Sequence, residues 1–304
     1  MLRTDTRVQF PRIFHPSDFS DASNVAFAHA LKLAVAGKSS LTVLHTGATR
    51  SDDTWAEFPR VRRTLERWKL LPPDSPKEAI CGLGLDVEKV ALPHSDPARS
   101  IVHYLARHPH DLIVLATHQH DGFERWTHEQ VAEPIARNSA EMTLFIPHGI
   151  EGFVSDADGG STLRNILIPV DRIPDPQIAI DGATAIAGGL VCHDAAATLL
   201  HVGEETLSPE VLLPGRMGLQ WRRIYRQGNV EQQILQAADE CHADLIVMAT
   251  RGHHRFLDAL RGSTTERIVR NSRCPVLAVP AYRAAEPVNA TVEGLATGAL
   301  AVGI

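Results

Sequence analysis

The chain contains one long stretch of sequence twice. Residues 111–147 and 244–280 align at a constant offset of 133 residues without a gap, and 15 of the 37 aligned positions are identical, among them DLIV, AT and RNS. The beginnings of the two copies also correspond, because RIFHPSD at 12–18 and NILIPVD at 165–171 are both apolar runs that end in Pro-x-Asp. Self-similarity of this kind requires a fold made of two copies of one unit, so the sequence indicates a tandem duplication.

The composition is that of an ordinary globular protein and argues against two function classes. Of the 304 residues, 44% are hydrophobic and 22% are charged, which is close to the average for globular domains. The formal net charge of −6 argues against a protein that binds nucleic acid mainly through charge. No run of 18 apolar residues occurs, since the best candidate, 183–200, contains His193 and Asp194. We therefore expect no membrane-spanning helix.

The N-terminus and the cysteines indicate a cytoplasmic protein. The first residues, MLRTDTRVQFPRIF, contain no apolar segment of signal-peptide length and no small-residue cleavage site. The four cysteines are far apart and form no C-x-x-C pair: Cys81, Cys192, Cys241 and Cys274. A disulfide framework or a structural zinc site is therefore not expected, and reduced thiols in the cytoplasm are the interpretation that fits.

Within each copy, short apolar runs alternate with longer stretches of helical periodicity. This alternation predicts β–α units and a parallel sheet, and continuous runs such as LIVL and LIVM are typical of parallel strands covered on both faces. The predicted strands of the first copy are 13–15, 41–45, 86–91, 111–116 and 143–146. Those of the second copy are 165–170, 198–202, 220–225, 244–249 and 276–279, with helices over 177–188, 230–241 and 263–271.

The repeats also set the expected domain organisation. A first domain spans 1–148 and a second spans 162–284. Between them, 149–161 is rich in Gly, Asp and Ser, as linkers are. The last segment, 285–304, shows no clear period and is treated as a tail.

Polar residues that follow the strands of the second copy form the candidate binding site, because ligands of open α/β sheets bind beyond the carboxyl ends of the strands. Asp171 follows the first strand and Val202 ends the second. A carboxylate there is suited to accept hydrogen bonds from ribose hydroxyls or from an adenine amine. Gly252 permits close backbone contact, and Gly262 precedes Ser263, which begins an S-x-x-E capping box. A glycine before a helix N-terminus lets a phosphate approach free backbone N–H groups.

The spacing of these glycines resembles the nucleotide-binding signature of the universal stress protein family. The signature consists of Gly or Ala, two residues, Gly, nine residues, Gly, and Ser or Thr, and is formed here by Ala249, Gly252, Gly262 and Ser263. The Pro-x-Asp end of the first strand and CPVLAVP at the last strand are similar to that family too, and the resemblance covers both copies. It implies two tandem open α/β sandwiches, each with a five-stranded parallel sheet of the adenine nucleotide alpha-hydrolase-like, Rossmann-like type.

The resemblance further implies a stress-response protein that binds ATP in its second domain, with Mg²⁺ held through the nucleotide. The expected nucleotide-binding residues are Asp171, Val202, Met248, Ala249, Arg251, Gly252, Gly262, Ser263 and Thr264. No Lys of the motif loop is placed to reach a γ-phosphate, which leaves Arg251, Arg255 and Arg261 as candidates. Since domains of this kind pair through their last strands, an internal pseudo-dimer is expected. A homodimer and an unknown protein partner stay open.

The first copy departs from the signature at the positions of both glycines and of the serine. Gln119 stands at the position of Gly252, Glu129 at that of Gly262 and Gln130 at that of Ser263, although Asp18 and Glu133 remain. A carboxylate would then lie where phosphates are bound, and two like charges about 4 Å apart repel by roughly 4 kcal/mol at an effective dielectric constant near 20. We interpret the nucleotide site of the first copy as degenerate.

Other readings of the same residues stay open. One alternative is that Gly262 and Ser263 form only a helix cap. Asp18 and Asp171 are candidate N-caps, and Met248 is a candidate core residue. The neighbouring histidines His118, His120, His253 and His254 suggest a metal, but no carboxylate or Cys completes a ligand set. No G-x-S-x-G elbow, no P-loop and no catalytic base are found. Binding is thus favoured over catalysis, with a nucleotide-independent scaffold and a slow ATPase as alternatives.

Overall fold

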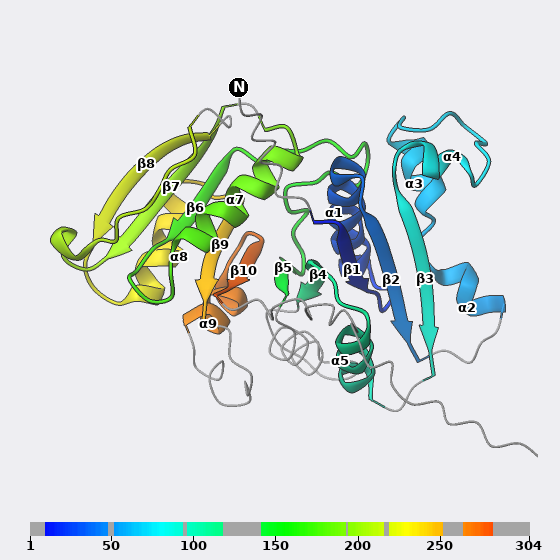
Figure 1. The fold of residues 1–304 in the computed structure, drawn as a ribbon, viewed down its shortest axis with the longest axis horizontal. Coiled ribbons are helices and arrows are strands. Elements are labelled where there is room, and N and C mark those ends of the chain that lie inside the picture. The colour runs from blue at the N-terminus through cyan, green and yellow to red at the C-terminus, as the bar shows by residue number, and fades with distance from the viewer. Residues whose placement is uncertain are drawn as a thin grey trace, which may run out of the picture.

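The computed structural model describes residues 10–47, 52–93, 96–117, 141–192, 194–215, 219–251 and 264–281, with the backbone alone at 52–54. Ten strands in this part of the chain form one sheet in the order β3-β2-β1-β4-β5-β10-β9-β6-β7-β8 (Figure 1). The strands of the first copy are β1 (Arg12–Pro16), β2 (Ser40–Thr46), β3 (Asp86–Leu92), β4 (Leu112–Thr117) and β5 (Met142–Pro147). Those of the second are β6 (Asn165–Pro169), β7 (Ala195–Val202), β8 (Leu219–Arg226), β9 (Leu245–Thr250) and β10 (Val276–Pro280).

The order of the strands is symmetric about the middle of the sheet. Outward from the centre, each copy contributes its last, fourth, first, second and third strand, and the five strands of one copy run parallel. At the centre β10 pairs antiparallel with β5, with Leu277 opposite Leu144. The expected pairing of the two last strands is therefore present, and it joins the two five-stranded sheets into one.

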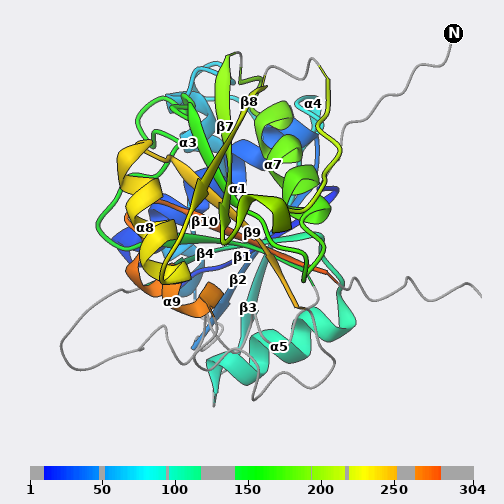
Figure 2. The ribbon, with the colours of Figure 1, turned by 90° about the vertical axis from the view of Figure 1, so that its left-hand side faces the viewer.

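Helices cover both faces of this sheet. The helices of the described residues are α1 (Asp21–Gly37), α2 (Asp52–Glu57), α3 (Val61–Arg67), α4 (Ala79–Gly82), α5 (Pro97–Arg107), α7 (Gln177–Gly189), α8 (Val230–Glu240) and α9 (Thr264–Asn271), with a 3-10 turn, η2, at Glu205–Leu207. The helices α1 and α7 share one continuous apolar core on one face. On the other face α5 packs on the first copy, and α8 and α9 pack on the second. Figure 2 shows α7 and α8 on opposite sides of the strands of the second copy.

The predicted elements agree with the structure to within a few residues. The two DLIV segments form β4 and β9, and every residue of β4 is buried, as expected for a parallel strand covered on both faces. The helix predicted over 230–241 is α8, whose N-cap Asn229 accepts a hydrogen bond from the Gln232 backbone N–H. The predicted helix start at Ser263 lies just outside the described residues, which resume at Thr264.

The connection after the second strand differs between the copies, although their strands repeat. Between β2 and β3 the chain forms α2, α3 and α4, and Phe58, Leu65 and Trp68 are buried in the core there. Between β7 and β8 the described residues form only η2 and irregular chain, with Leu207 and Leu212 exposed. The two copies therefore have the same strand order, but the segments that connect their second and third strands differ.

The predicted linker is packed against the first copy. Phe153 and Val154 are buried, and their backbone N–H groups donate to Nε2 of His29 in α1, at 3.0 and 3.2 Å. Gly152 has φ +70°, and a Cβ at this position would collide with the His29 ring. Trp68, at the end of α3, donates from Nε1 to the carbonyl of Asp156 at 2.9 Å. This segment is thus fixed by side chains that lie far away in the sequence.

Two further expectations concern the membrane and the tail. No helix in the described part of the chain is long and apolar enough to cross a bilayer. The predicted tail, 285–304, lies outside the described residues.

Candidate functional site

Three neighbouring strands of the second copy end at the same edge of the sheet. The strand β6 pairs with β9 on one side and with β7 on the other, and all three are parallel. Asp171 follows β6, Val202 is the last residue of β7, and Arg251 follows β9 directly. Chain order reverses between β6 and β9 (Figure 1), and in open α/β sheets ligands bind beyond the carboxyl ends of the strands at such a reversal.

Asp171 presents an exposed carboxylate at this edge. Its hydrogen bond in the described part of the chain is to the neighbouring Arg172, whose backbone N–H donates to Oδ1 at 2.7 Å. The helix α7 begins six residues later with Pro176 at its N-cap, so Asp171 does not cap this helix. Its carboxylate therefore takes no part in capping α7.

Asp18, the counterpart in the first copy, is engaged by the start of its helix. Its Oδ1 accepts hydrogen bonds from the backbone N–H of Ser20 at 3.0 Å and from the Ser20 hydroxyl at 2.7 Å. Ser20 in turn is the N-cap of α1. The two aspartates occupy equivalent sequence positions, but Asp18 is half-buried and hydrogen-bonded to Ser20, whereas Asp171 is exposed.

The apolar residues expected at the site lie partly in the core. Met248 is 6% exposed and belongs to the apolar cluster beneath α8 and α9, as the alternative interpretation of a core residue expects. Ala249 is half-buried and packs against the core on the α7 face, while Val202 is half-buried at the strand end. Arg251 is exposed.

Several expected residues are outside the described part of the chain. These are Gly252, Gly262 and Ser263 of the signature, Arg255 and Arg261, the paired histidines, and Gln119, Glu129, Gln130 and Glu133 of the first copy. Thr264 is described and is the first residue that α9 shows. The structure thus brings Asp171, Val202, Ala249 and Arg251 to one edge and leaves the glycine loop as a prediction.

The structure places one further polar residue at this edge that was not among the residues predicted from the sequence. His201, the penultimate residue of β7, is 4% exposed, and its Nδ1 lies 3.1 Å from the carbonyl oxygen of Val170. Its Nε2 is buried and has no hydrogen-bond partner in the described chain. A signal was present, because His45 and His201 end the equivalent apolar runs LTVLH and ATLLH of the two copies.

The equivalent place in the first copy is covered by aromatic rings. His45 makes the same backbone contact, from Nδ1 to the carbonyl oxygen of Ser17 at 2.7 Å. Its ring stacks on Phe19 with 4.0 Å between centroids, and Phe19 contacts the buried Phe58 at 5.3 Å. In the second copy the residue after the strand-end aspartate is Arg172, whose Nε donates to the carbonyl of Leu207. The described residues place no ring over His201.

Among the described residues, no group of three or more His, Cys, Asp or Glu side chains is arranged to hold a metal ion.

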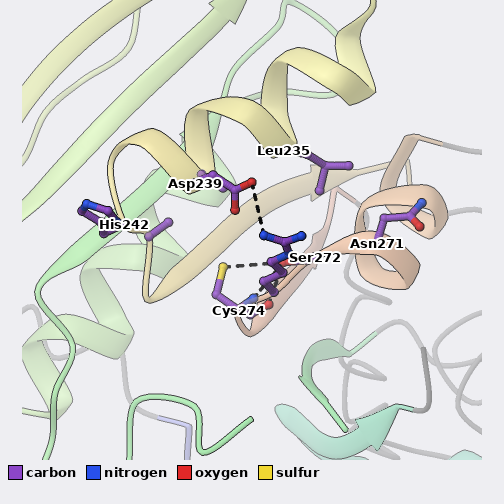
Figure 3. Close-up of a pocket in the computed structure, with 9 residues that line it drawn as sticks. Leu235, Asp239, His242, Asn271, Ser272 and Cys274 are labelled. Atoms are coloured by element: carbon purple, nitrogen blue, oxygen red, sulfur yellow. Dashed lines mark hydrogen bonds and ion pairs between the residues drawn. The ribbon is translucent and has the colours of Figure 1, made fainter. Parts of the chain in front are cut away.

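A separate cavity of about 290 Å³ lies at the opposite ends of the strands, where α8 and α9 finish (Figure 3). Arg273 and Asp239 form an ion pair of 4.0 Å there. Cys274 is buried beside Ser272, and burial raises the pKa of its thiol to about 12. A thiol with this pKa stays protonated at neutral pH and is a poor nucleophile.

Comparison with known proteins bears on the fold and the family. The sequence profile of the universal stress protein family matches residues 9–147 and 218–280. The chain is 30% identical over 148 residues to universal stress protein Sll1654 of Synechocystis sp., covering 42% of this chain and 92% of that protein. It is 28% identical over 141 residues to universal stress protein A homolog 1 of Coxiella burnetii, covering 38% and 95%.

The fold is similar to that of a solved universal stress protein from Archaeoglobus fulgidus. The two chains are 19% identical, the match covers 90% of this chain and 100% of the other, and the TM-score is 0.58. The order of the strands and the helices on both faces define a protein of the α/β class. Since the family profile matches well over half of the chain, the chain belongs to the universal stress protein family, as a tandem member.

The residues expected at the site fall partly inside and partly outside the segments matched by the family profile. Met248, Ala249, Arg251, Gly252, Gly262, Ser263 and Thr264 fall within the second matched segment. Asp171, Val202 and His201 fall outside both segments, and their assignment depends on the position of β6 and β7 in the sheet.

Proposed function

We propose that the protein binds ATP, accompanied by Mg²⁺, at the carboxyl ends of β6, β7 and β9, and that binding alters its conformation or its affinity for a partner. The observation that carries the proposal is the exposed Asp171 carboxylate on the strand between β9 and β7. An exposed carboxylate at the carboxyl ends of these strands is suited to accept hydrogen bonds from sugar hydroxyls.

The order of the strands suggests how the nucleotide lies. The predicted phosphate-binding glycines follow β9 and lead into α9, whose N-terminal N–H groups favour anions. The strand β7 is two strand spacings away from β9, about 10 Å. The triphosphate would be held by Gly262, Ser263 and Thr264, the ribose by Asp171, and the base by the end of β7 near Val202.

Magnesium is proposed to be bound through the phosphates. The described residues offer no cluster of three metal-ligating side chains, and Mg²⁺ commonly uses substrate phosphates and water in addition to one or two protein oxygens. The ion would neutralise phosphate charge and so support binding next to the Asp171 carboxylate.

Only the second copy is proposed to bind ATP. Asp18 is hydrogen-bonded by Ser20 at the start of α1, and Glu129 replaces the glycine that precedes the phosphate-binding helix. Both differences disfavour an anionic nucleotide. The Asp18 carboxylate is already used as an acceptor by Ser20, and Glu129 adds a negative charge near the phosphates.

Isothermal titration with Mg-ATP tests the proposal. The wild-type protein should bind about one equivalent per chain. The Gly262→Glu variant copies what the first copy has at Glu129, so it should lose more than tenfold in affinity, or 1.4 kcal/mol. The variant should still fold, which circular dichroism would check. The matched variant Glu129→Gly should gain no second site, because Gln119 and Gln130 remain.

Other stoichiometries would contradict the proposal. Two equivalents per chain, or unchanged affinity in Gly262→Glu, would place ATP elsewhere. A wild-type protein that binds no nucleotide, and from which mass spectrometry recovers none after native purification, would indicate the scaffold alternative. Phosphate release from bound ATP would indicate a slow ATPase.

A further inference from the structure

Four large apolar side chains are exposed on two loops of the second copy. One loop, 171–176, leads from β6 into α7, and the other, 203–215, follows β7. The four are Ile173, Leu207, Leu212 and Leu213, with exposed fractions of 67%, 48%, 80% and 38%. Single exposed apolar residues are common on protein surfaces, but several on adjoining segments mark a surface that binds another molecule. We call these four residues the apolar patch.

Hydrogen bonds hold the two loops beside each other. Nε of Arg172 donates to the carbonyl oxygen of Leu207 at 3.1 Å. The side-chain amide of Gln177, the first residue of α7, makes two hydrogen bonds with the backbone of Leu212. Its Nε2 donates to the Leu212 carbonyl at 3.0 Å, and its Oε1 accepts from the Leu212 N–H at 2.9 Å. The exposed leucines are thus presented by fixed backbone, which lowers the entropy cost for a molecule that binds them.

The surface around the apolar patch is acidic. Within 171–181 and 204–213 the sequence has six carboxylates and one basic residue, Arg172. All six carboxylates are exposed: Asp171, Asp175, Asp181, Glu204, Glu205 and Glu210. From β8, Arg223 adds a second cation, whose Nη1 donates to the carbonyl of Pro209 at 3.3 Å. Apolar side chains within a surface of net negative charge fit a partner that combines apolar and basic side chains.

We propose that the apolar patch is the docking surface for a partner protein, which contributes a segment with apolar side chains on one face and Lys and Arg beside them. The apolar side chains cover Ile173, Leu207 and Leu212, and the cations lie against the surrounding carboxylates. The surface adjoins the proposed nucleotide site through Asp171 and Arg172, but the inference does not depend on nucleotide binding.

Charge disfavours two other occupants of the apolar patch. A symmetric dimer uses the same surface on both subunits, so it would bring two acidic surfaces together. An anionic lipid surface attracts basic segments and would be repelled by the carboxylates around the apolar patch. A basic, apolar segment of another protein is the occupant that these charges favour.

The first copy has a different surface at the corresponding connection. Phe58 and Trp68 of that connection are buried in the core, and Trp55, which is partly exposed, stacks on Phe58 with 5.3 Å between ring centroids. Its charges are balanced, because the sequence of 52–78 has six acidic and six basic residues. The combination of exposed leucines with net negative charge is therefore a property of the second copy.

Titration of the full-length protein with synthetic peptides, in the absence of nucleotide, tests the proposal. The basic probe is a helical peptide of Leu and Lys with its Leu residues on one face. One control peptide has Glu in place of Lys, and another keeps the composition of the basic probe but spreads Leu around the helix. Fluorescence anisotropy should show the basic probe binding at least about tenfold tighter than either control, and its affinity should fall as NaCl is raised from about 50 to about 300 mM.

Variants of the apolar residues locate the contact. Leu207→Ser and Leu212→Ser should each weaken binding of the basic probe about fivefold to tenfold, because each removes an apolar side chain from the contact. Val191→Ser is the matched control, since Val191 is 65% exposed and lies just beyond the other end of α7. Its affinity for the basic probe should equal that of the wild type. Circular dichroism checks that all three variants are folded.

A charge variant tests the acidic surroundings separately. Replacing Glu204, Glu205 and Glu210 together by Gln leaves the apolar patch intact but removes three negative charges. This variant should bind the basic probe more weakly than the wild type at low salt, and its affinity should depend less on the NaCl concentration.

Four outcomes would overturn the proposal. Equal affinity for the three peptides, or the same affinity for the basic probe in Leu207→Ser, Leu212→Ser and Val191→Ser, would show that the apolar patch does not recognise such a segment. Dimers of the wild type that Leu212→Ser dissociates would assign the patch to a second copy of the chain. Binding to phosphatidylserine vesicles that Leu212→Ser abolishes would assign it to a membrane. A variant that ends at residue 284 and binds the basic probe at least about tenfold tighter than the full chain would assign it to residues 285–304.

Discussion

At the scale of single residues, repetition in the sequence does not guarantee repetition of role. Asp111 and Asp244 begin the two DLIV segments and have the same role, because each accepts a hydrogen bond from the backbone N–H at the start of the neighbouring strand. The acceptor is Oδ2 in both copies, at 3.0 Å from the nitrogen of Arg12 and 2.8 Å from that of Asn165. Asp18 and Asp171 also repeat, yet the first supports a helix start and the second faces solvent.

This difference predicts opposite effects of the same substitution. Asp171→Ala should weaken Mg-ATP binding about tenfold or more, because a hydrogen bond to a charged group is worth roughly 1.5–3 kcal/mol, and should change the free energy of unfolding by less than about 0.5 kcal/mol. Asp18→Ala should lower the free energy of unfolding by about 1 kcal/mol and leave ATP binding unchanged. Titration calorimetry and urea unfolding of both variants measure these quantities. Equal effects of the two substitutions would contradict the distinction.

At the scale of elements, β5 and β10 hold the two copies together. Leu144 and Leu277 face each other across this pair and are fully buried. The helices α1 and α7 meet over the same joint and share one apolar core. A copy expressed alone would therefore expose the edge of its last strand and an apolar surface, a combination that promotes association.

Separately expressed halves should accordingly fail to behave as monomers. We expect 1–148 and 162–284 each to self-associate through the exposed last strand, or to be insoluble, and the two mixed halves to form a one-to-one complex. Size-exclusion chromatography with light scattering at several concentrations measures the masses. Two halves that remain monomeric at high concentration would show that the β5–β10 pair contributes little.

At the scale of the whole molecule, the first copy buries three histidines in neutral form. Burial lowers the pKa values of His15, His29 and His110 to about 4. Nδ1 of each ring contacts a backbone carbonyl oxygen, and Nε2 of His29 accepts from the two N–H groups of Phe153 and Val154. A proton on that Nε2 would leave it unable to accept and would weaken the attachment of residues 149–161 to α1.

Stability should therefore decrease in mild acid. Unfolded histidines titrate near pH 6.5, so between about pH 6.5 and 4 the unfolded chain binds more protons than the folded one, and the free energy of unfolding falls as the pH falls. The slope contributed by each histidine is at most about 1.4 kcal/mol per pH unit. Urea unfolding between pH 7 and pH 5 measures it, above the range in which most carboxylates titrate.

A matched pair of variants tests whether the buried histidines cause this pH dependence of the free energy of unfolding. His29→Gln removes one of the three buried imidazoles. The slope of the free energy of unfolding against pH should therefore decrease by up to about 1.4 kcal/mol per pH unit, which corresponds to one proton. His103→Gln changes an exposed histidine of α5 and should leave it unchanged. A free energy of unfolding that stays constant from pH 7 to pH 5 in the wild type would contradict the expected cost of charging these rings.

The sequence by itself determined the two copies, the parallel β–α units, most strand boundaries and the edge on which Asp171, Val202 and Arg251 lie. These follow from local periodicity and from a fixed offset between repeats, which are properties of residues close together in the chain or aligned by duplication. The tertiary structure decided the packing of residues 149–161 under His29, since the partners in that contact are 124 positions apart. It also decided that Phe19 covers His45 while Nε2 of His201 stays unpaired, because whether a buried atom finds a partner depends on which side chains reach it after packing.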